Sequence, residues 1–228
     1  MDEGTRVAQL LDAQDKAAQL FDEVNNRELI RSGITERALS DEIGDIARQK
    51  FGVTRHWHKR IVRSGENTLE TARGNPPDRT IGDDDIVFLD FGPIFEEWEA
   101  DFGRTFVLGD DPRKLALREY LPLIWEAGRD HFRRHPDITG EQLFHHIVGL
   151  SQDAGWLFGG AIAGHLVGHF PHENIPGDKI ESYIAPGSTN PMRREDGAGN
   201  TCHWILEVHL VDGDRRYGGF HEELLDLP

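Results

Sequence analysis

The sequence predicts an α+β fold built from two similar halves. Segments with apolar residues at helical spacing come before runs of β-branched and aromatic residues bounded by Gly and Pro, which is typical of helices followed by strands. Residues 34–39 (ITERAL) return as residues 138–143 (ITGEQL), with Ile, Thr and Leu at one fixed offset. Each copy follows a longer helical segment and precedes strands, which indicates an internal repeat. Helical periodicity alone accounts for part of the match.

Composition indicates a globular protein. The 228 residues can bury a substantial core, and contents of 37% hydrophobic and 29% charged residues are typical of soluble domains. We expect one domain over residues 1–228. No window approaches 18 apolar residues, and the N-terminus lacks a basic-then-apolar pattern, so we expect neither a membrane span nor a signal peptide.

The net charge argues against one class of partner, and the cysteine content indicates the expected cellular location. The net charge of −16 argues against a nucleic-acid partner, because phosphate backbones attract basic surfaces. Cys202 is the only cysteine in the sequence, so no internal disulfide can form, and a reducing cytoplasm is the expected location.

The first 82 residues predict two helices, a strand and a loop. Residues 7–31 carry an apolar stripe among charges, and Thr35 is placed to cap a second helix that Gly52 ends. Residues 55–63 alternate His56 and His58 with Trp57 and Lys59, which predicts a strand whose histidines face either a cleft or solvent. Residues 64–82 are rich in Gly, Pro and Asn and predict a loop.

The centre of the sequence predicts a hairpin-like pair of strands with one aspartate on each. Residues 85–89 and 104–108 are apolar strands separated by a break at Gly-Pro, with Asp90 and Asp101 between them. A carboxylate at the end of a buried strand needs a positive partner. Arg104 could neutralise one of the two, whereas a metal ion could hold both. Two solvated aspartates are the alternative.

The second half repeats the helix pair. Residues 113–134 predict a helix, although Pro122 inside it requires a kink or a restart. Thr139 is placed to cap the following helix.

The last third of the chain predicts strands. Residues 163–177 contain two prolines and are not expected to be helical, and residues 178–200 are expected to be irregular. Residues 203–211 are a strongly apolar strand with Glu207 in its middle, and residues 217–227 are a second strand that contains Glu222 and Glu223.

Five candidate metal ligands therefore lie on or beside apolar strands: Asp90, Asp101, His165, Glu207 and Glu222. Several carboxylates cannot converge in a dry site without strong positive charge, because like charges repel. Two divalent cations would balance them. Carboxylates combined with an imidazole suit Mn²⁺, Co²⁺, Fe²⁺ or Zn²⁺.

The order Asp, Asp, His, Glu, Glu resembles the pita-bread metallopeptidases, which include methionine aminopeptidase, proline dipeptidase, aminopeptidase P and the non-peptidase creatinase. In that family the two aspartates stand eleven residues apart, as they do here. The other similar segments are GHLVG at 164–168, His172-Glu173, ILEV around Glu207 and FHEELL around Glu222. The resemblance covers nearly the whole chain and implies two pseudo-symmetric halves around a curved antiparallel sheet.

The resemblance also implies roles for the ligands. Asp90 would bind one metal ion through both oxygens, and Asp101 would bridge the two ions together with Glu222. His165 and Glu207 would bind the second ion. Glu223 is adjacent to Glu222 and is the alternative for the last ligand.

The implied activity is that of a metal-dependent exopeptidase that cleaves short peptides near their N-terminus. A hydroxide activated by two metal ions would attack the scissile carbonyl. His172 would hydrogen-bond that carbonyl or the oxyanion, and Glu207 would shuttle a proton to the leaving amine. Relatives often dimerise, so a homodimer is one expectation.

Within the family, DFGRTF at 101–106 looks more like the Asp-x-x-Arg-Thr of proline dipeptidases than the Asp-Thr-Ser of methionine aminopeptidases. We therefore expect a Xaa-Pro dipeptide substrate, with His169, His58 and Arg104 as candidate substrate contacts. Two features depart from proline dipeptidases. Their additional N-terminal domain is not expected within these 228 residues, and their loop histidine has no counterpart in residues 68–77, so His56 or His58 would have to replace it.

Three alternatives remain open on the sequence. His165 and His169 stand at i and i+4, as in a single-zinc motif, but Leu166 occupies the position of the catalytic Glu. The same fold also serves as a metal-free peptide-binding module, although such modules lose ligands that this chain retains. A creatinase-like hydrolase of non-peptide C–N bonds is the third alternative.

Overall fold

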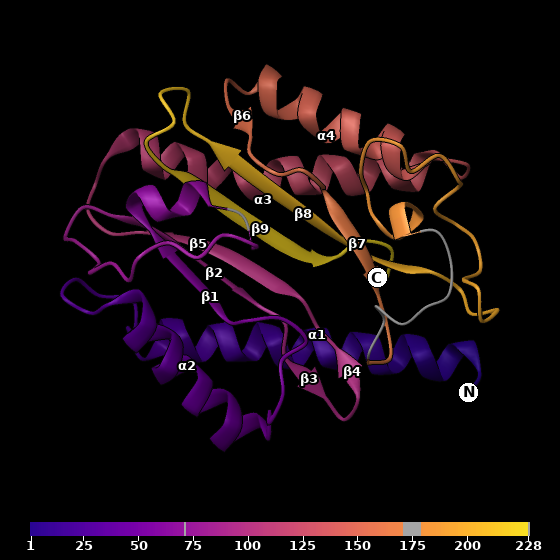
Figure 1. The fold of residues 1–228 in the computed structure, drawn as a ribbon, viewed down its shortest axis with the longest axis horizontal. Coiled ribbons are helices and arrows are strands. Elements are labelled where there is room, and N and C mark those ends of the chain that lie inside the picture. Colours follow the sequence, from indigo (N-terminus) through magenta and orange to yellow (C-terminus); the bar gives the residue numbers. More distant parts are fainter. Residues whose placement is uncertain (71, 171–178, 228) are drawn as a thin grey trace.

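The computed structural model describes residues 1–70, 72–170 and 179–227. Along the chain, a pair of helices is followed by a group of strands, and this order occurs twice (Figure 1). The helices are α1 (Glu3–Asn26), α2 (Glu36–Phe51), α3 (Pro112–Arg134) and α4 (Gly140–Asp153), with 3-10 turns η1 (Gly65–Leu69) and η3 (Lys179–Ser182). The strands are β1 (Ile61–Ser64), β2 (Ile86–Phe91), β3 (Ile94–Phe95), β4 (Trp98–Glu99), β5 (Phe102–Val107), β6 (Leu157–Phe158), β7 (Gly164–Val167), β8 (His203–Val211) and β9 (Gly218–Leu224).

Each half begins with a long helix and a shorter one, and the repeated Ile-Thr segment starts the shorter helix in both. The Thr35 side chain accepts a hydrogen bond from Ala38 N, and the Thr139 side chain accepts one from Gln142 N. These contacts satisfy backbone N–H groups that the first turn of a helix leaves free. Gly52 ends α2 in the left-handed conformation, with φ at 68°.

The two long helices differ in part from the sequence prediction. The first helix begins at Glu3 rather than Val7, because Asp2 caps it, and it ends at Asn26 rather than Arg31. Helix α3 starts with Pro112 in its first turn and runs through Pro122 as one helix without restarting there.

Seven of the strands form an antiparallel sheet in the order β1-β2-β5-β9-β8-β6, with β7 also paired to β8. Strands β3 and β4 pair with each other in a separate hairpin. The pair β5–β9 joins the two halves, since β5 belongs to the first group of strands and β9 to the last. The predicted strand over residues 203–211 is confirmed as β8, and the strand predicted over 217–227 is shorter, as β9.

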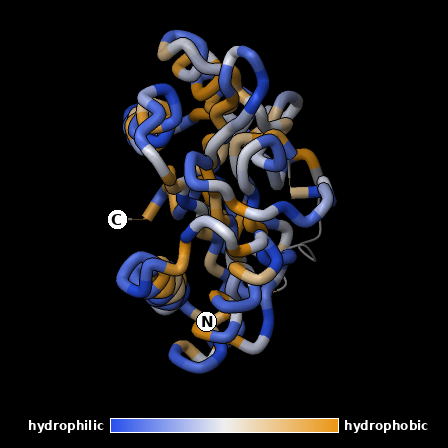
Figure 2. The backbone as a smooth tube through the Cα atoms, turned by 90° about the vertical axis from the view of Figure 1, so that its left-hand side faces the viewer, coloured by the Kyte–Doolittle hydropathy of each residue, from blue (hydrophilic) through white to orange (hydrophobic). Residues whose placement is uncertain are grey.

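One face of the sheet is covered by helices. Phe21 of α1 packs edge-on against Phe91 and Phe102, and Trp125 of α3 donates a hydrogen bond to Leu206 O at 2.9 Å. The buried apolar residues form one large cluster around α1 and α2 and another around α3 and α4. In Figure 2, hydrophobic residues gather toward the inside of the molecule and hydrophilic ones line its outside. The helices therefore bury one face of the sheet and leave the other available for a site.

The strand predicted over residues 55–63 is wrong for most of its length. Strand β1 covers only Ile61–Ser64, and His56 makes a single bridge to Pro93. The backbone of Trp57 instead donates to Gly92 O at 2.9 Å. The polar alternation in this segment thus belongs to a bent connection that crosses the end of β2.

None of the helices in the described part of the chain combines the length and the apolar character that crossing a lipid bilayer requires.

The cap of α4 allows a direct test of the helix start. Two hydrogen bonds form a reciprocal cap: Gln142 N donates to the Thr139 hydroxyl, and Thr139 N donates to the Gln142 side chain. Replacing Thr139 with Ala removes the first of these bonds. We expect Thr139→Ala to lower the free energy of unfolding by about 1 kcal/mol, measured by urea denaturation. The exposed residue Thr54 gives the control variant Thr54→Ala, which should leave the midpoint unchanged. Equal midpoints for both variants would contradict the assignment.

Candidate metal centre

A single row of paired residues places three carboxylates across the sheet. Asp90 of β2 pairs with Gly103 of β5, Gly103 pairs with Glu222 of β9, and Glu222 pairs with Glu207 of β8. Directly opposed residues of an antiparallel sheet point to the same face. Asp90, Glu207 and Glu222 therefore project from the face opposite the helices, and Gly103 adds no side chain between them.

Two further ligands join this face from neighbouring positions. Asp101 lies two residues before Gly103, so its side chain has the same orientation. His165 of β7 pairs with Ile205 of β8, which is two residues before Glu207. The five residues that the sequence analysis singled out as ligands are thus brought to one face of one sheet.

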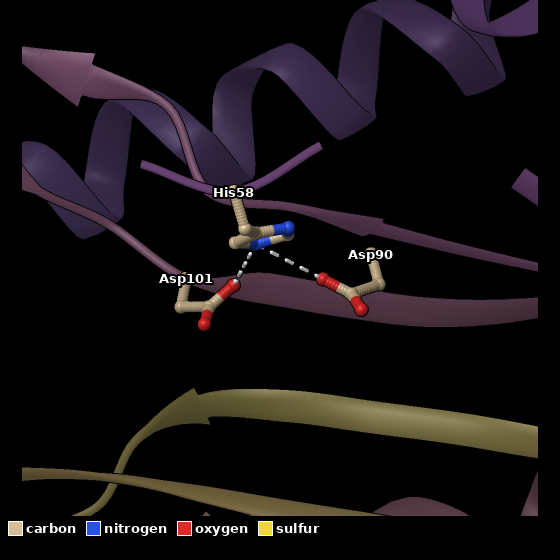
Figure 3. Close-up of side chains that lie close together, drawn as sticks. All are labelled: His58, Asp90 and Asp101. Atoms are coloured by element: carbon tan, nitrogen blue, oxygen red, sulfur yellow. Dashed lines mark hydrogen bonds and ion pairs between the residues drawn. The ribbon is translucent and has the colours of Figure 1, made fainter. Parts of the chain in front are cut away.

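Asp101 is the central contact of the site. His165 Nε2 lies 3.0 Å from Asp101 Oδ2 and 3.9 Å from Glu222 Oε1. On the other side, His58 Nε2 lies 3.1 Å from Asp101 Oδ1 and 3.4 Å from Asp90 Oδ1 (Figure 3). Ligand atoms of Asp101, His165 and Glu222 all lie within 4.8 Å of one another, and so do those of His58, Asp90 and Asp101.

The donor set fits divalent cations. Asp90, Asp101 and Glu222 are buried, with exposures of 6%, 3% and 2%. One oxygen each of Glu207 and Glu222 is buried and has no hydrogen-bond partner in the described structure, and Asp90 Oδ1 has only the ion-pair contact with His58 Nε2 at 3.4 Å. A buried carboxylate oxygen without a donor is costly, so an electrophile is expected beside it. Carboxylate oxygens and imidazole nitrogens are the ligands that Mn²⁺, Fe²⁺, Co²⁺ and Zn²⁺ accept.

The protein alone balances this charge by retaining protons. Burial raises the pKa of Asp90, Glu207 and Glu222 above their ordinary values, and the neighbouring carboxylates raise those pKa values further. Burial also raises the pKa of Asp101, but His58 and His165 outweigh it and hold that pKa well below its usual range.

The two imidazoles are the partners of these carboxylates. Burial lowers the pKa of His58, but Asp90 and Asp101 outweigh this effect and raise the pKa to about 9. For His165, burial likewise opposes protonation, and Asp101 and Glu207 raise the pKa to about 9. Protons on these rings therefore occupy the position of positive charge that a bound cation would take over.

The other predicted residues lie in different places. Arg104 forms an ion pair with Glu223 and donates to Glu222 O at 2.9 Å, on the face opposite the carboxylate row. Glu222 thus lies in the site, whereas Glu223 faces away from it. His169 is exposed and lies edge-on to Trp98, with ring centroids 5.4 Å apart. His172 falls outside the described residues.

Two residues that were not predicted from the sequence, Trp57 and Gly92, also shape the site. The indole of Trp57 lies edge-on to both His58 and His165, with ring centroids 4.4 and 5.1 Å apart. A Cβ at Gly92 would collide with the Trp57 indole and the His58 ring. The Gly92-Pro93 break was identified only as a strand end, although a glycine beside two aromatic rings permits their close approach.

A family model for metallopeptidase family M24 matches residues 8–204 of this chain. The chain belongs to metallopeptidase family M24. Its resemblance to the pita-bread metallopeptidases is therefore confirmed.

Individual relatives agree with the family assignment. A Xaa-Pro dipeptidase from Lactobacillus delbrueckii subsp. lactis is 27% identical over 143 residues, covering 62% of this chain and 37% of that protein. The solved X-Pro aminopeptidase from Thermotoga maritima superposes with a TM-score of 0.75 at 20% identity, covering 99% of this chain and 59% of that one. A dipeptidase from Pyrococcus horikoshii gives a TM-score of 0.73 at 23% identity, covering 96% and 56%.

These comparisons confirm the α+β pita-bread fold. The chain spans less than two fifths of the length of the curated Lactobacillus relative and between half and three fifths of the two solved chains.

The pKa shifts of the site residues predict how metal binding depends on pH. The raised pKa values of Asp90, Glu207 and Glu222 mean that the metal-free fold loses stability as pH rises above their ordinary range. The contributions of His58 and His165 are complete below about pH 6.5 and are lost as pH rises through about 9. Asp101 has a lowered pKa, so its contribution is constant above its ordinary value of 3.8.

We therefore expect Mn²⁺ to raise the melting temperature more at pH 8.5 than at pH 6, because fewer protons compete for the ligands. Each proton displaced changes the binding free energy by about 1.4 kcal/mol per pH unit. Calorimetric melts of chelator-treated protein with and without Mn²⁺ measure the difference. A shift that is the same at both pH values would show that the ligands release no protons.

Proposed function

We propose that this protein is a metal-dependent exopeptidase that hydrolyses a peptide bond near the N-terminus of a short peptide, of the Xaa-Pro dipeptidase or aminopeptidase type. The observation that carries the proposal is the row of carboxylates on one sheet face, with buried oxygens that have no hydrogen-bond donor in the described structure. Membership of a metallopeptidase family and a relative named Xaa-Pro dipeptidase support it.

Two divalent cations are the proposed cofactors, with Mn²⁺ first and Co²⁺, Fe²⁺ or Zn²⁺ as substitutes. Asp90, Asp101, His165, Glu207 and Glu222 would hold them. Four ionised carboxylates carry a charge of about −4, which two divalent ions neutralise, so the buried row would need no retained protons. When bound, such ions lower the pKa of a coordinated water and polarise a carbonyl oxygen.

Residues of this chain would supply the proton transfer and the substrate contacts. Glu207 is half-buried on the same sheet face as the other carboxylates, and it is the proposed carboxyl that accepts a proton and passes it to a leaving amine. His169 is exposed near Trp98 and is a proposed contact for the substrate, and His172 is proposed to bind the reacting carbonyl. We propose that residues 1–228 act as one catalytic unit, because β5 and β9 join both halves in one sheet.

The decisive experiment is hydrolysis of Xaa-Pro dipeptides with added Mn²⁺. The wild-type protein should release free proline, and chelation should abolish the activity. Asp101→Asn should lower kcat/KM by more than about 100-fold, because loss of an outer partner of a metal ligand already costs 10- to 100-fold. The exposed residue Asp110 gives the control Asp110→Asn, which should keep full activity.

The possible failures have different meanings. Metal uptake without Xaa-Pro hydrolysis, but with cleavage of another amide, would overturn the substrate and keep the class of enzyme. Normal folding with no metal uptake would instead favour a peptide-binding module of the same fold.

A further inference from the structure

The segment before β1 carries a histidine into the carboxylate site. His58 and the two aspartates Asp90 and Asp101 form a group of donors whose ligand atoms lie within 4.8 Å of one another. We propose that His58 is a sixth metal ligand, on the ion held by Asp90 and Asp101. This inference rests on the proposed function, and it gives His58 a different role from the substrate contact expected from the sequence.

The backbone holds His58 in place from both sides. Trp57 N donates to Gly92 O at 2.9 Å, and Ile94 N donates to Arg55 O at 3.1 Å. The Trp57 indole Nε1 donates to Ala100 O at 3.2 Å. These bonds tie the segment to the turn that separates Asp90 from Asp101, so the His58 ring is positioned between the two aspartates (Figure 3).

The hydrogen bond at the other ring nitrogen prepares Nε2 for a cation. His58 Nδ1 lies 2.7 Å from the carbonyl oxygen of Lys59. A carbonyl can only accept, so Nδ1 carries the hydrogen, and in a neutral ring Nε2 then holds the lone pair. Metal-binding histidines are oriented in this way, with the second nitrogen donating to a carbonyl or carboxylate. Two carboxylate oxygens face Nε2, so three electron-rich atoms surround one point.

His165 has the same arrangement on the other side of Asp101. Its Nδ1 lies 2.8 Å from Leu166 O, and its Nε2 lies 3.0 Å from Asp101 Oδ2. His58 approaches Oδ1 of the same carboxylate at 3.1 Å. Each ring therefore donates to the carbonyl of the next residue and presents Nε2 to a different oxygen of Asp101.

The symmetry of these contacts defines a two-centre site. One centre would take His58 with Asp90, and the other would take His165 with Glu207. Asp101 and Glu222 would serve both centres. If His165 is a ligand, the matching geometry at His58 supports the same role there. The donor set would then be four carboxylates and two neutral imidazoles, which leaves no net charge around two divalent ions.

The histidine count can be measured without an activity assay. We propose loading the 228-residue protein with Co²⁺ and recording proton NMR spectra, in which the Nδ1–H of a coordinated imidazole appears as a strongly shifted, solvent-exchangeable signal. Wild-type protein should show two such signals. His58→Gln and His165→Gln should each lose a different one, and His56→Gln, two residues away, should keep both.

Calorimetric titration with Mn²⁺ gives a second readout. We expect two ions per wild-type chain, and in His58→Gln the affinity for one of them should fall at least about tenfold while the other is retained. A single shifted signal in the wild type that persists in His58→Gln would overturn the proposal and leave the proposed function standing. No ion uptake by folded wild-type protein would overturn the proposed function itself, and the sixth ligand with it.

Discussion

Repulsion among buried carboxylates is the constraint on which the site depends. Asp90, Glu222 and Glu207 stand in one row across four neighbouring strands, and Asp101 lies beside them. Ionised together in a dry site they would repel one another strongly, which is why burial and mutual proximity raise the pKa values of three of them. Two imidazoles provide the positive charge in direct contact with these carboxylates. The fold must therefore be stable enough to hold this row together.

That stability comes from the other face of the sheet. The long helices α1 and α3 pack there with the large aromatic side chains, and the two large apolar clusters are built around the helix pairs. Because side chains alternate along a strand, burying one face also determines which residues point to the other. A slip of one residue in β9 would exchange Glu222 for Glu223, which pairs with Arg104 on the helical face. Apolar packing on one face thus determines which candidate ligands point to the other face.

Much of this architecture is visible in the sequence because it depends on local signals. The caps at Thr35 and Thr139, the apolar run of β8 and the acidic residues on apolar strands all follow from residue type and spacing. The family resemblance supplied the order of the ligands, and the family is now established.

The sequence could not predict the register in which strands far apart in the chain pair with one another. Whether Glu222 or Glu223 faces the site depends on the pairing of β9 with β5 and β8, which involves residues far away in the chain. The alternating pattern at 55–63 predicted a strand, but tertiary hydrogen bonds from Trp57 to Gly92 and Ala100 bend the segment instead. Local periodicity could not reveal that bend, and so it could not place His58 beside Asp90 and Asp101.

The internal repeat would give the proposed two-centre site a structural origin. Each half contributes a helix pair that starts with the same Ile-Thr signal, and each half contributes strands to the common sheet. Asp90 and Asp101 come from the first half, whereas His165, Glu207 and Glu222 come from the second. With those five alone, the first half supplies no imidazole. His58 lies in the first half and faces Asp101 as His165 does from the second, so its inclusion makes the contributions of the two halves equivalent. A fold of two similar halves that binds a pair of like ions would favour such a balance. Each proposed ion would then meet one imidazole and one carboxylate from its own half, and the carboxylates of Asp101 and Glu222 would be shared between the two ions.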